Sequence, residues 1–427
     1  MTIMDKLALG IDIGTSGARV AVLDAAGDVV AEAAAAMAAP MRTGASLIQD
    51  ASHWLEAAVA AMAKLRASDV LHRIGAVAVD GTSGTVLGVD QDGRPLAPAR
   101  MYNDACRPES IAAIAAVAPA SSAAHGASSA LGRAMEMQVL RPHRILHQAD
   151  WLAGQLSGRF DISDENNALK TGYDPVARRW PQWIAAAGMD VSLLPDVVPA
   201  GTAIGRCQGP HARTLGLPAG ALVVTGTTDG CAAFLATGAD QPGDGVTSLG
   251  STLVLKLLCD KPLFAPEYGI YSHRIGDVWL AGGASNTGGA ALLQHFTVEE
   301  MRALEPQLAP DRATGLDYYP LPGAGERFPV NDPAVASRVT PCPADRAVFL
   351  QGLLEGIANV EALGYQRLAE IGAPPLSSLR TVGGGAGNKV WTEIRRRRVP
   401  APFLAARSEA AAAGVARLAL KAMRAVS

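Results

Sequence analysis

The stretch Leu7–Asp24, LALGIDIGTSGARVAVLD, constrains the fold of this chain more than any other. The large apolar residues of its first half stand at every second position: Leu7, Leu9, Ile11 and Ile13. This period of two predicts a strand with one apolar face. The turn 14–17 has a glycine at each end, and the runs 19–23 and 29–33 predict a second and a third strand. The chain is therefore expected to open as an antiparallel meander.

An aspartate interrupts the small face of the first strand. Asp12 stands between Gly10 and Gly14 in an otherwise uncharged segment. Carboxylates are rarely buried without compensation, and a divalent metal is a common compensation. The turn that follows offers backbone N–H groups and the hydroxyls of Thr15 and Ser16, which can cradle a phosphate. An ordinary hairpin with a solvent-facing aspartate is the alternative, because short glycine motifs recur by chance.

Length and composition narrow the class of protein. A chain of 427 residues predicts two domains, and a new core that begins near residue 220 divides them into 1–218 and 219–427. The hydrophobic content of 49% and the charged content of 18% are typical of a globular protein. The net charge of −3 gives no electrostatic argument for binding nucleic acid, and the basic run 395–398 is best explained as a solvated helix face.

The cysteines and the apolar runs indicate a compartment. The five cysteines lack the close spacing of zinc or redox sites, which favours reduced thiols in a cytosol. The first residues lack a secretion signal, and no apolar stretch reaches the ~20 residues that a membrane span needs. We therefore expect a cytoplasmic protein that binds neither nucleic acid nor membrane.

The second half of the chain repeats the logic of the first hairpin. Residues 244–258 again predict a strand, a glycine turn with two hydroxyls, and a strand. The turn Gly250–Thr252 corresponds to the turn that begins at Gly14. We infer a pseudo-duplication with one hairpin in each domain. Two such tips across a cleft would hold one phosphate chain from both sides.

A run of glycines follows the predicted strand 379–382. The segment Gly383–Asn388 reads GGGAGN and precedes a predicted helix. Glycines without side chains would let a flat ring lie against the backbone. Tight packing alone is the alternative, and the segment lacks the pattern of a P-loop.

Asp229 lies between the predicted strand 221–225 and a helix. An acid at a helix start is favoured as a cap and by the helix dipole, so capping explains it as well as catalysis does. The neighbouring Gly226 and Gly230 would leave room for a ligand, which favours catalysis.

Four segments in this order and spacing resemble the FGGY carbohydrate kinases: IDIGTSGARVAVLD, GTTDG, SLGST and VGGGAGNKVW. The resemblance covers essentially the whole chain, and ARSEAAAAGVARLAL is similar to the last helix of that family. It implies an α/β fold of two ribonuclease H-like domains, as in the superfamily of actin, sugar kinases and heat-shock ATPases, with an active-site cleft between the domains. It also implies ATP and Mg²⁺ as cofactors, a small sugar as substrate, and allows a homodimer.

Two segments carry the resemblance to a substrate group. DGTSGTVLGVD (80–90) and MYNDACR (101–107) are similar to pentulose kinases of the D-ribulokinase or xylulokinase-like group. Xylulokinases typically have Met-His, and glycerol kinases Arg-Glu, where this chain has Ser83-Gly84. The GTSGT variant resembles D-ribulose kinases. D-Ribulose is therefore the expected substrate, with D-xylulose or another pentulose or polyol as the alternative.

The resemblance also implies roles for single residues. Asp229 would be the base that deprotonates the sugar hydroxyl, and Asp12 would hold Mg²⁺ through water. The implied ATP-binding residues are Thr15, Ser16, Gly250, Ser251, Thr252, Gly383, Gly384, Gly385 and Asn388. The implied substrate-binding residues are Asp12, Ser83, Asn103, Asp104 and Asp229, and weaker candidates for ligand contacts are Arg19, Thr82 and Arg107.

Other functions are known on the same fold. It also serves chaperone ATPases and actin-like filaments, so a switch ATPase is a rival interpretation, and a sugar-binding relative without catalysis is another. No substrate-binding domain follows the nucleotide half, and the polar loops 81–85 and 101–107 suit a small polyol. We therefore expect a kinase whose two domains close to exclude water.

Overall fold

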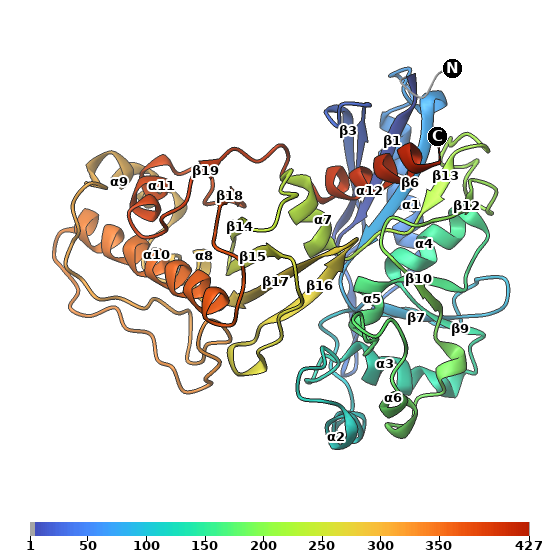
Figure 1. The fold of residues 1–427 in the computed structure, drawn as a ribbon, viewed down its shortest axis with the longest axis horizontal. Helices are drawn as coiled ribbons and strands as arrows, with labels where there is room; N and C mark the ends of the chain where they lie inside the picture. The colour runs from blue at the N-terminus through green and yellow to red at the C-terminus, as the bar shows by residue number, and fades with distance from the viewer. Residues whose placement is uncertain (1–4, 427) are drawn as a thin grey trace. The chain divides into compact units, whose positions relative to one another are not determined.

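The structure is a computed structural model that describes residues 5–426 (Figure 1). The chain forms two compact units, of which the first comprises residues 1–238, 273–276 and 407–427. The second comprises residues 239–272 and 277–406. These bounds differ from the predicted 1–218 and 219–427, because the segment after residue 219 and the last helix pack with the first unit. The assignment of sugar to one domain and nucleotide to the other stays a prediction, as does the cleft.

A six-stranded mixed sheet forms the centre of the first unit. Its strand order is β12-β13-β6-β1-β2-β3. The bounds are β1 Leu7–Ile13, β2 Gly17–Leu23, β3 Val29–Ala36, β6 Ile74–Gly81, β12 Ala203–Arg206 and β13 Leu222–Val224. The predicted meander is confirmed, since β1 pairs antiparallel with β2 and β2 with β3. β6 lies parallel to both β1 and β13, which is why residues 222–224 belong to this unit.

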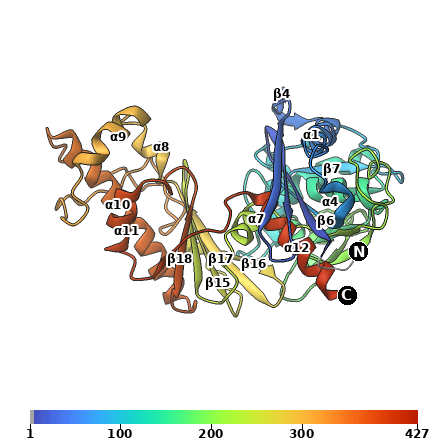
Figure 2. The ribbon, with the colours of Figure 1, turned by 90° about the horizontal axis from the view of Figure 1, so that it is seen from above.

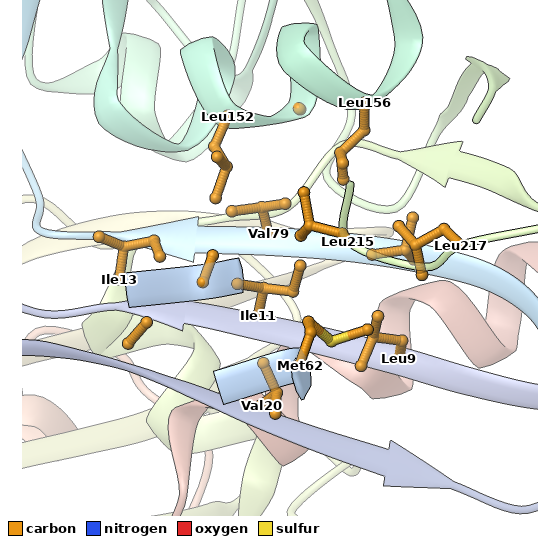
Figure 3. Close-up of a cluster of buried hydrophobic side chains, with 14 of the residues drawn as sticks. Leu9, Ile11, Ile13, Val20, Met62, Val79, Leu152, Leu156, Leu215 and Leu217 are labelled. Carbon is orange, nitrogen blue, oxygen red and sulfur yellow. The ribbon is translucent and has the colours of Figure 1, made fainter. Parts of the chain in front are cut away.

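The large residues of β1 face two helices, α1 (Ala51–Lys64) and α4 (Gln148–Ser157). Figure 3 shows Leu152 and Leu156 of α4 above Val79 and Ile11 of the sheet. All four side chains are fully buried. Each buried side chain of this size contributes roughly 1.5–3 kcal/mol, so this face holds much of the core.

The small residues of β1 face α7 (Asp229–Ala236) and α12 (Ala411–Ala425), which lie together on the other side of the sheet (Figure 2). A Cβ atom at Gly10 would stand 1.9 Å from the carbonyl oxygen of Ala412. The small face is therefore set by the close approach of α12, a contact that the local sequence did not reveal.

Further elements of the first unit surround this sheet. A five-stranded sheet has the order β4-β5-β8-β7-β9, and β10 pairs with β11. The strands are β4 Met41–Thr43, β5 Ser46–Gln49, β7 Val86–Val89, β8 Ala99–Arg100, β9 Arg144–His147, β10 Ile162–Asp164 and β11 Asp196–Val198. The helices are α2 Pro108–Val117, α3 Ala130–Met137, α5 Glu165–Leu169 and α6 Gln182–Ala186.

The second unit is built around a sheet of order β16-β17-β15-β14-β18-β19. The strands of this sheet are β14 Asp244–Leu249, β15 Leu253–Cys259, β16 Tyr271–Ile275, β17 Val278–Ser285, β18 Ser378–Val382 and β19 Phe403–Leu404, and residues 273–275 of β16 group with the first unit. The helices are α8 Gly289–Leu292, α9 Val298–Leu304, α10 Arg346–Glu370 and α11 Lys389–Arg396. The predicted second hairpin is confirmed, because β14 and β15 pair antiparallel around residues 250–252.

Candidate active site

An acidic group forms where the central strands of the first unit end. The parallel register of β1 and β6 places Asp12 directly opposite Asp80. The next residue of β6, Gly81, forms a parallel bridge with Thr228, which precedes Asp229. Three carboxyl groups that are far apart in the sequence thus come from neighbouring segments, at the ends of β1 and β6 and just after Thr228.

The charges in this group depend on one another. The Asp80 side chain is wholly buried, and neither of its oxygens has a hydrogen-bond partner among residues 5–426. Burial, followed by the negative charges of Asp12 and Asp229, raises the pKa of Asp80 well above its usual value. Arg19 opposes this shift, and its Nη1 lies 3.2 Å from Oδ2 of Asp12. Arg19 is therefore a partner of Asp12, which the sequence left open.

Asp80 is the functional candidate that sequence reasoning missed. A signal was available, because the first strand and the strand 74–79 each run into an aspartate just before a glycine-containing turn. The carboxyl ends of adjacent parallel strands lie at the same edge of a sheet, where ligands of α/β proteins bind. The pairing itself could not be inferred, since it requires the strand register.

Asp229 is the first residue of α7, and the N-cap position belongs to Thr228. The Asp229 side chain is half-buried and accepts a hydrogen bond of 2.7 Å from the backbone N–H of Gly230. The capping explanation is weakened, because the acid lies one position past the cap. The argument from Gly226 was wrong, since a Cβ there would stand 1.7 Å from the carbonyl oxygen of Val79. This glycine serves chain packing rather than a ligand.

Hydrogen bonds hold the backbone of the first hairpin turn in place. The N–H of Gly14 donates to the carbonyl of Gly17 at 3.0 Å. Gln49 donates from Nε2 to the carbonyl of Thr15 at 3.3 Å, and the N–H of Met37 donates to the carbonyl of Ser16. Ser16 is exposed and Thr15 half-buried, and the hydrogen bonds to the carbonyl groups of both residues order the tip.

The loop after β6 presents one buried hydroxyl. Ser83 Oγ is buried and lacks a hydrogen-bond partner within the part of the chain that the structure describes. The hydroxyl of Thr82 bonds instead to Thr85 at 2.6 Å and to Gln148 at 2.8 Å. Thr82 therefore shapes the loop, whereas Ser83 retains its hydrogen-bonding capacity for a ligand.

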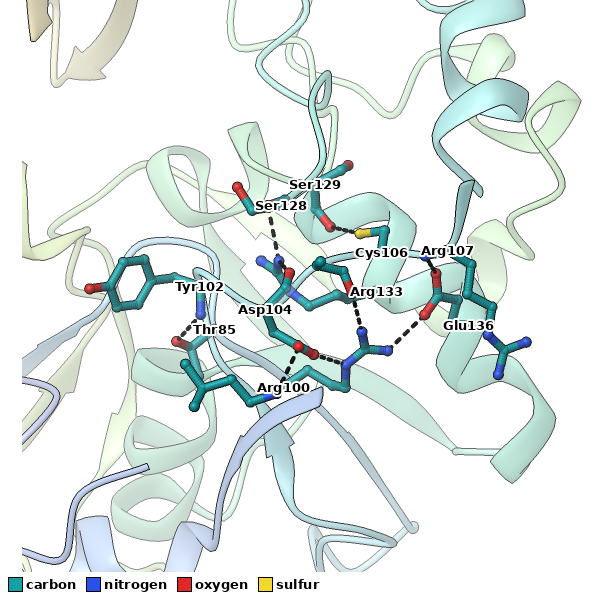
Figure 4. Close-up of polar contacts among 12 residues, drawn as sticks. Thr85, Arg100, Tyr102, Asp104, Cys106, Arg107, Ser128, Ser129, Arg133 and Glu136 are labelled. Atoms are coloured by element: carbon teal, nitrogen blue, oxygen red, sulfur yellow. Dashed lines mark hydrogen bonds and ion pairs between the residues drawn. The ribbon is translucent and has the colours of Figure 1, made fainter. Parts of the chain in front are cut away.

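The loop 101–107 differs from the expectation at one residue. Asn103 is exposed, as is the side chain of Arg107. Asp104 is buried, and its carboxylate accepts from the N–H of Leu47 at 2.7 Å and from Nε of Arg100 (Figure 4). We therefore assign Asp104 to the support of this loop instead of direct contact with sugar, because both of its oxygens already have donors.

A pocket of about 700 Å³ lies within the second unit. Five of the predicted ATP-binding residues line it: Gly250, Ser251, Gly384, Gly385 and Asn388. Its apolar lining includes Leu293, Val298 and Met301, and the side chain of Leu293 is 57% exposed. The predicted Thr252 and Gly383 are not among its lining residues. The second turn and the glycine run, separated by more than a hundred residues in sequence, thus share one cavity.

The three glycines of the run 383–385 are required for different structural reasons. A Cβ at Gly384 would meet nothing within 4 Å, whereas one at Gly385 would stand 2.6 Å from the Trp391 ring. Gly383 has φ +89°, a left-handed conformation that favours glycine. Asn388 caps α11 by accepting from the N–H of Trp391 at 2.7 Å. Only at Gly384, among these three glycines, does the absent side chain leave open space.

Two features are absent from residues 5–426. No group of three or more His, Cys, Asp or Glu side chains is arranged to hold a metal ion by itself. In the same range, none of the helices combines the length and the apolar character that a membrane span requires.

Models of protein families match nearly the whole chain. The N-terminal domain of the FGGY family of carbohydrate kinases matches residues 7–116 and 133–236, and its C-terminal domain matches 245–423. This chain belongs to the FGGY family of carbohydrate kinases. The resemblance inferred from the four motifs is confirmed.

The sequence identity between this chain and individual relatives in the FGGY family is modest. The chain is 30% identical to an autoinducer-2 kinase of Yersinia enterocolitica over 63% of its own length and 56% of the relative's. It is 25% identical to the xylulose kinase of Escherichia coli over 90% and 83% of the two chains. The chain thus spans little more than half of the first of these relatives.

Solved structures agree with the expected fold. A xyloylose kinase from Brucella ovis superposes with a TM-score of 0.87 at 25% identity, covering 99% of this chain and 91% of that one. A xylulose kinase from Rhodospirillum rubrum gives 0.84 at 22% identity, with 97% and 89% covered. The predicted two-domain α/β fold of the sugar kinases is confirmed.

Proposed function

We propose that this protein transfers the γ-phosphoryl group of ATP to a hydroxyl group of a pentulose, with D-ribulose as the first choice. The observation that carries the proposal is the group of Asp12, Asp80 and Asp229 at the strand ends of a family member. Phosphoryl transfer needs positioned charges more than covalent chemistry, and such a group can supply them.

In this proposal both units contribute groups to the reaction. Asp229 takes the proton from the sugar hydroxyl, for which a half-buried carboxylate at the start of α7 is suited. The hydroxyls of Thr15 and Ser16 and the turn Gly250–Thr252 donate to the phosphates. The pocket at Gly384 receives the adenosine, with its ring against the apolar lining. Ser83 and Asn103 bind the sugar.

The residues of the first unit also fit a divalent cation. Mg²⁺ is usually held by one or two carboxylates together with substrate phosphates, so no cluster of protein ligands is required. Asp12, with the unpartnered oxygens of Asp80 behind it, would hold the cation. When bound, Mg²⁺ neutralises charge on the transferring phosphoryl group.

D-Xylulose is the second candidate, because two of the relatives are named xylulose kinases. The Ser83-Gly84 pair, where xylulokinases typically have Met-His, favours D-ribulose. The cytoplasmic location, the absence of other partners and a homodimer stay predictions.

The test is ADP release with ATP and Mg²⁺ across a panel of pentuloses and polyols. A kinase is stimulated by one acceptor, with D-ribulose expected to give the highest kcat/KM. A switch ATPase releases ADP equally without sugar, and a binding protein releases none. Either of these two outcomes would contradict the proposal.

A further inference from the structure

A single arginine, Arg133 of α3, joins the two loops that carry the proposed sugar contacts. Its Nη2 donates to the carbonyl of Gly84 at 2.7 Å, and its Nη1 donates to the carbonyl of Asp104 at 2.7 Å. Nη1 also donates to the carbonyl of Ser128 at 2.9 Å (Figure 4). The acceptors follow Ser83 and Asn103 immediately in the sequence, so the guanidinium fixes the backbone next to both residues.

The environment of Arg133 is unusual for a charged side chain. It is 0% exposed, and its Nη1 and Nη2 donate to carbonyl oxygens rather than to carboxylates. Burying a charge without an ion-pair partner is costly, so the carbonyl dipoles that accept from Nη1 and Nη2 stabilise the guanidinium, whereas Nε has no hydrogen-bond partner among residues 5–426. A planar fork of donors can hold two loops at a fixed distance, which a lysine or an apolar residue cannot do.

A further hydrogen bond also connects the two loops. The backbone N–H of Tyr102 donates to Oγ1 of Thr85 at 3.1 Å. Gly84 has φ +96°, so the backbone after Ser83 adopts a conformation that a side chain would strain. This turn leaves Ser83 Oγ buried without a hydrogen-bond partner among residues 5–426, as expected of a group held for a ligand.

We propose that Arg133 is a positioning residue that sets the affinity for the sugar by holding Ser83 and Asn103 in register. It does not touch the sugar. The inference rests on the proposed function for its kinetic consequence, but its structural consequence can be measured on the free protein.

The kinetic experiment compares Arg133→Lys and Arg133→Met with Arg206→Met, an exposed arginine that donates to the carbonyl of Gly220. Both Arg133 variants should lower kcat/KM for the sugar roughly 10- to 100-fold, mainly through KM, because small misplacements of contacts have effects of this size. The KM for ATP should change less than about twofold, and Arg206→Met should match wild type. A double-mutant cycle of Arg133→Lys with Ser83→Ala should be strongly non-additive. Additive effects, or equal changes in both KM values, would overturn the proposal.

The second experiment is hydrogen exchange of unliganded wild type and Arg133→Lys. Exchange of the amides of Thr85, Tyr102 and Asp104 should accelerate together, while amides of β14 and α10 keep their rates. Unchanged exchange in both loops would refute the proposal even if no acceptor sugar were found. A lack of sugar-stimulated turnover in wild type would contradict the proposed function instead, so the two failures are distinguishable. If Arg133→Met does not fold, Arg133→Lys, which keeps the charge and the stem, carries both experiments.

Discussion

The two hairpins of this protein have the same strand arrangement, but they differ in the side chains near their turns. In both, an antiparallel pair ends in a short glycine turn, and a parallel third strand lies beside the first. The penultimate residue of β1 is Asp12, whose neighbours in register are Arg19 and Asp80. The penultimate residue of β14 is Ser248, whose neighbours in register are Val254 and Val382.

This difference separates chemistry from binding. Charges gathered at the first hairpin can organise a cation and a phosphoryl group, whereas the second hairpin, which carries no charged residue between Gly245 and Leu255, borders a pocket with an apolar lining. The turns are also supported differently. Gly250 and Ser251 accept from the N–H groups of Gly289 and Ala290 at the start of α8, so the second tip is attached to a helix. In the proposed function, one backbone plan thus serves two tasks, which the side chains at one matched position distinguish.

The largest expected effect concerns the base. Asp229→Asn should lower kcat about 10²–10⁴-fold, because the amide cannot accept the proton. Stability and the KM for ATP should stay near wild type, since Thr228 and not Asp229 occupies the cap position. Steady-state kinetics and thermal unfolding check this. A variant with more than about a tenth of the wild-type turnover would remove Asp229 from the role of base.

The second test changes the matched position of each hairpin, which is Asp12 in the first and Ser248 in the second. Asp12→Asn should lower kcat roughly 100-fold, as expected for the loss of one fixed charge beside the transferring group. Ser248→Ala, the matched change in the second hairpin, should leave kcat within about twofold of wild type, because its neighbours in register are valines. Titration with Mg²⁺ should show weaker cation binding, and so a higher half-saturating Mg²⁺ concentration, only for the Asp12 variant. Equal losses in the two variants would abolish the distinction between the hairpins.

The third test addresses the pocket of the second unit. Gly384→Val should raise the KM for ATP about tenfold, equivalent to ~1.4 kcal/mol, because its side chain would enter open space that the adenosine is proposed to fill. The KM for sugar should not change. Gly220→Val is the control, since a Cβ there also meets nothing within 4 Å but lies outside the pocket. A rise in the KM for sugar alone would place the glycine run elsewhere.

The smallest expected effect is on stability. Glu165 is buried, and this desolvation raises its pKa from 4.5 to about 7, although the charges of Arg178 and Arg274 oppose the shift. Folded wild type therefore retains a proton that the unfolded chain loses, and its stability falls as pH rises from about 4.5 to about 7. Glu165→Gln should be more stable than wild type by about 1–3 kcal/mol at pH 7, with little difference near pH 4.

Urea unfolding of wild type and Glu165→Gln at pH 4, 5.5 and 7 gives the measurement. The second unit supplies the contrast, because its buried Glu361 accepts two bonds of 2.7 Å from Arg395. Glu361→Gln should lose stability at pH 7, since it removes the charge that compensates a buried arginine. A pH-independent difference between Glu165→Gln and wild type would show that folding does not shift the pKa of Glu165.

Local pattern sufficed for most elements of both units. The period of two predicted β1 and the first hairpin, and the helical signal after residue 345 corresponds to α10. The second hairpin and the glycine run were also recognisable, and the structure brings them to one pocket. Each of these features depends on residues that are close together in the sequence, so the sequence alone determines them.

Register and long-range packing decided the rest. The facing of Asp12 and Asp80 requires the parallel alignment of two strands that are separated by an intervening helix. Gly226 looked like room for a ligand and is instead a contact with the backbone of β6. Asp104 looked like a sugar ligand and has its donors in Leu47 and Arg100. In each case the partner lies dozens of residues away or in another element.

The sequence by itself therefore determined the family, the two hairpins, the glycine run and the chemistry of the candidate residues, because these are written in local patterns. The tertiary structure alone decided that α12 closes the first sheet, that Asp80 joins Asp12, and that Arg133 holds two loops together. The physical reason is that burial and hydrogen bonding of a side chain depend on which distant segments surround it. Strand register and helix packing set those neighbours.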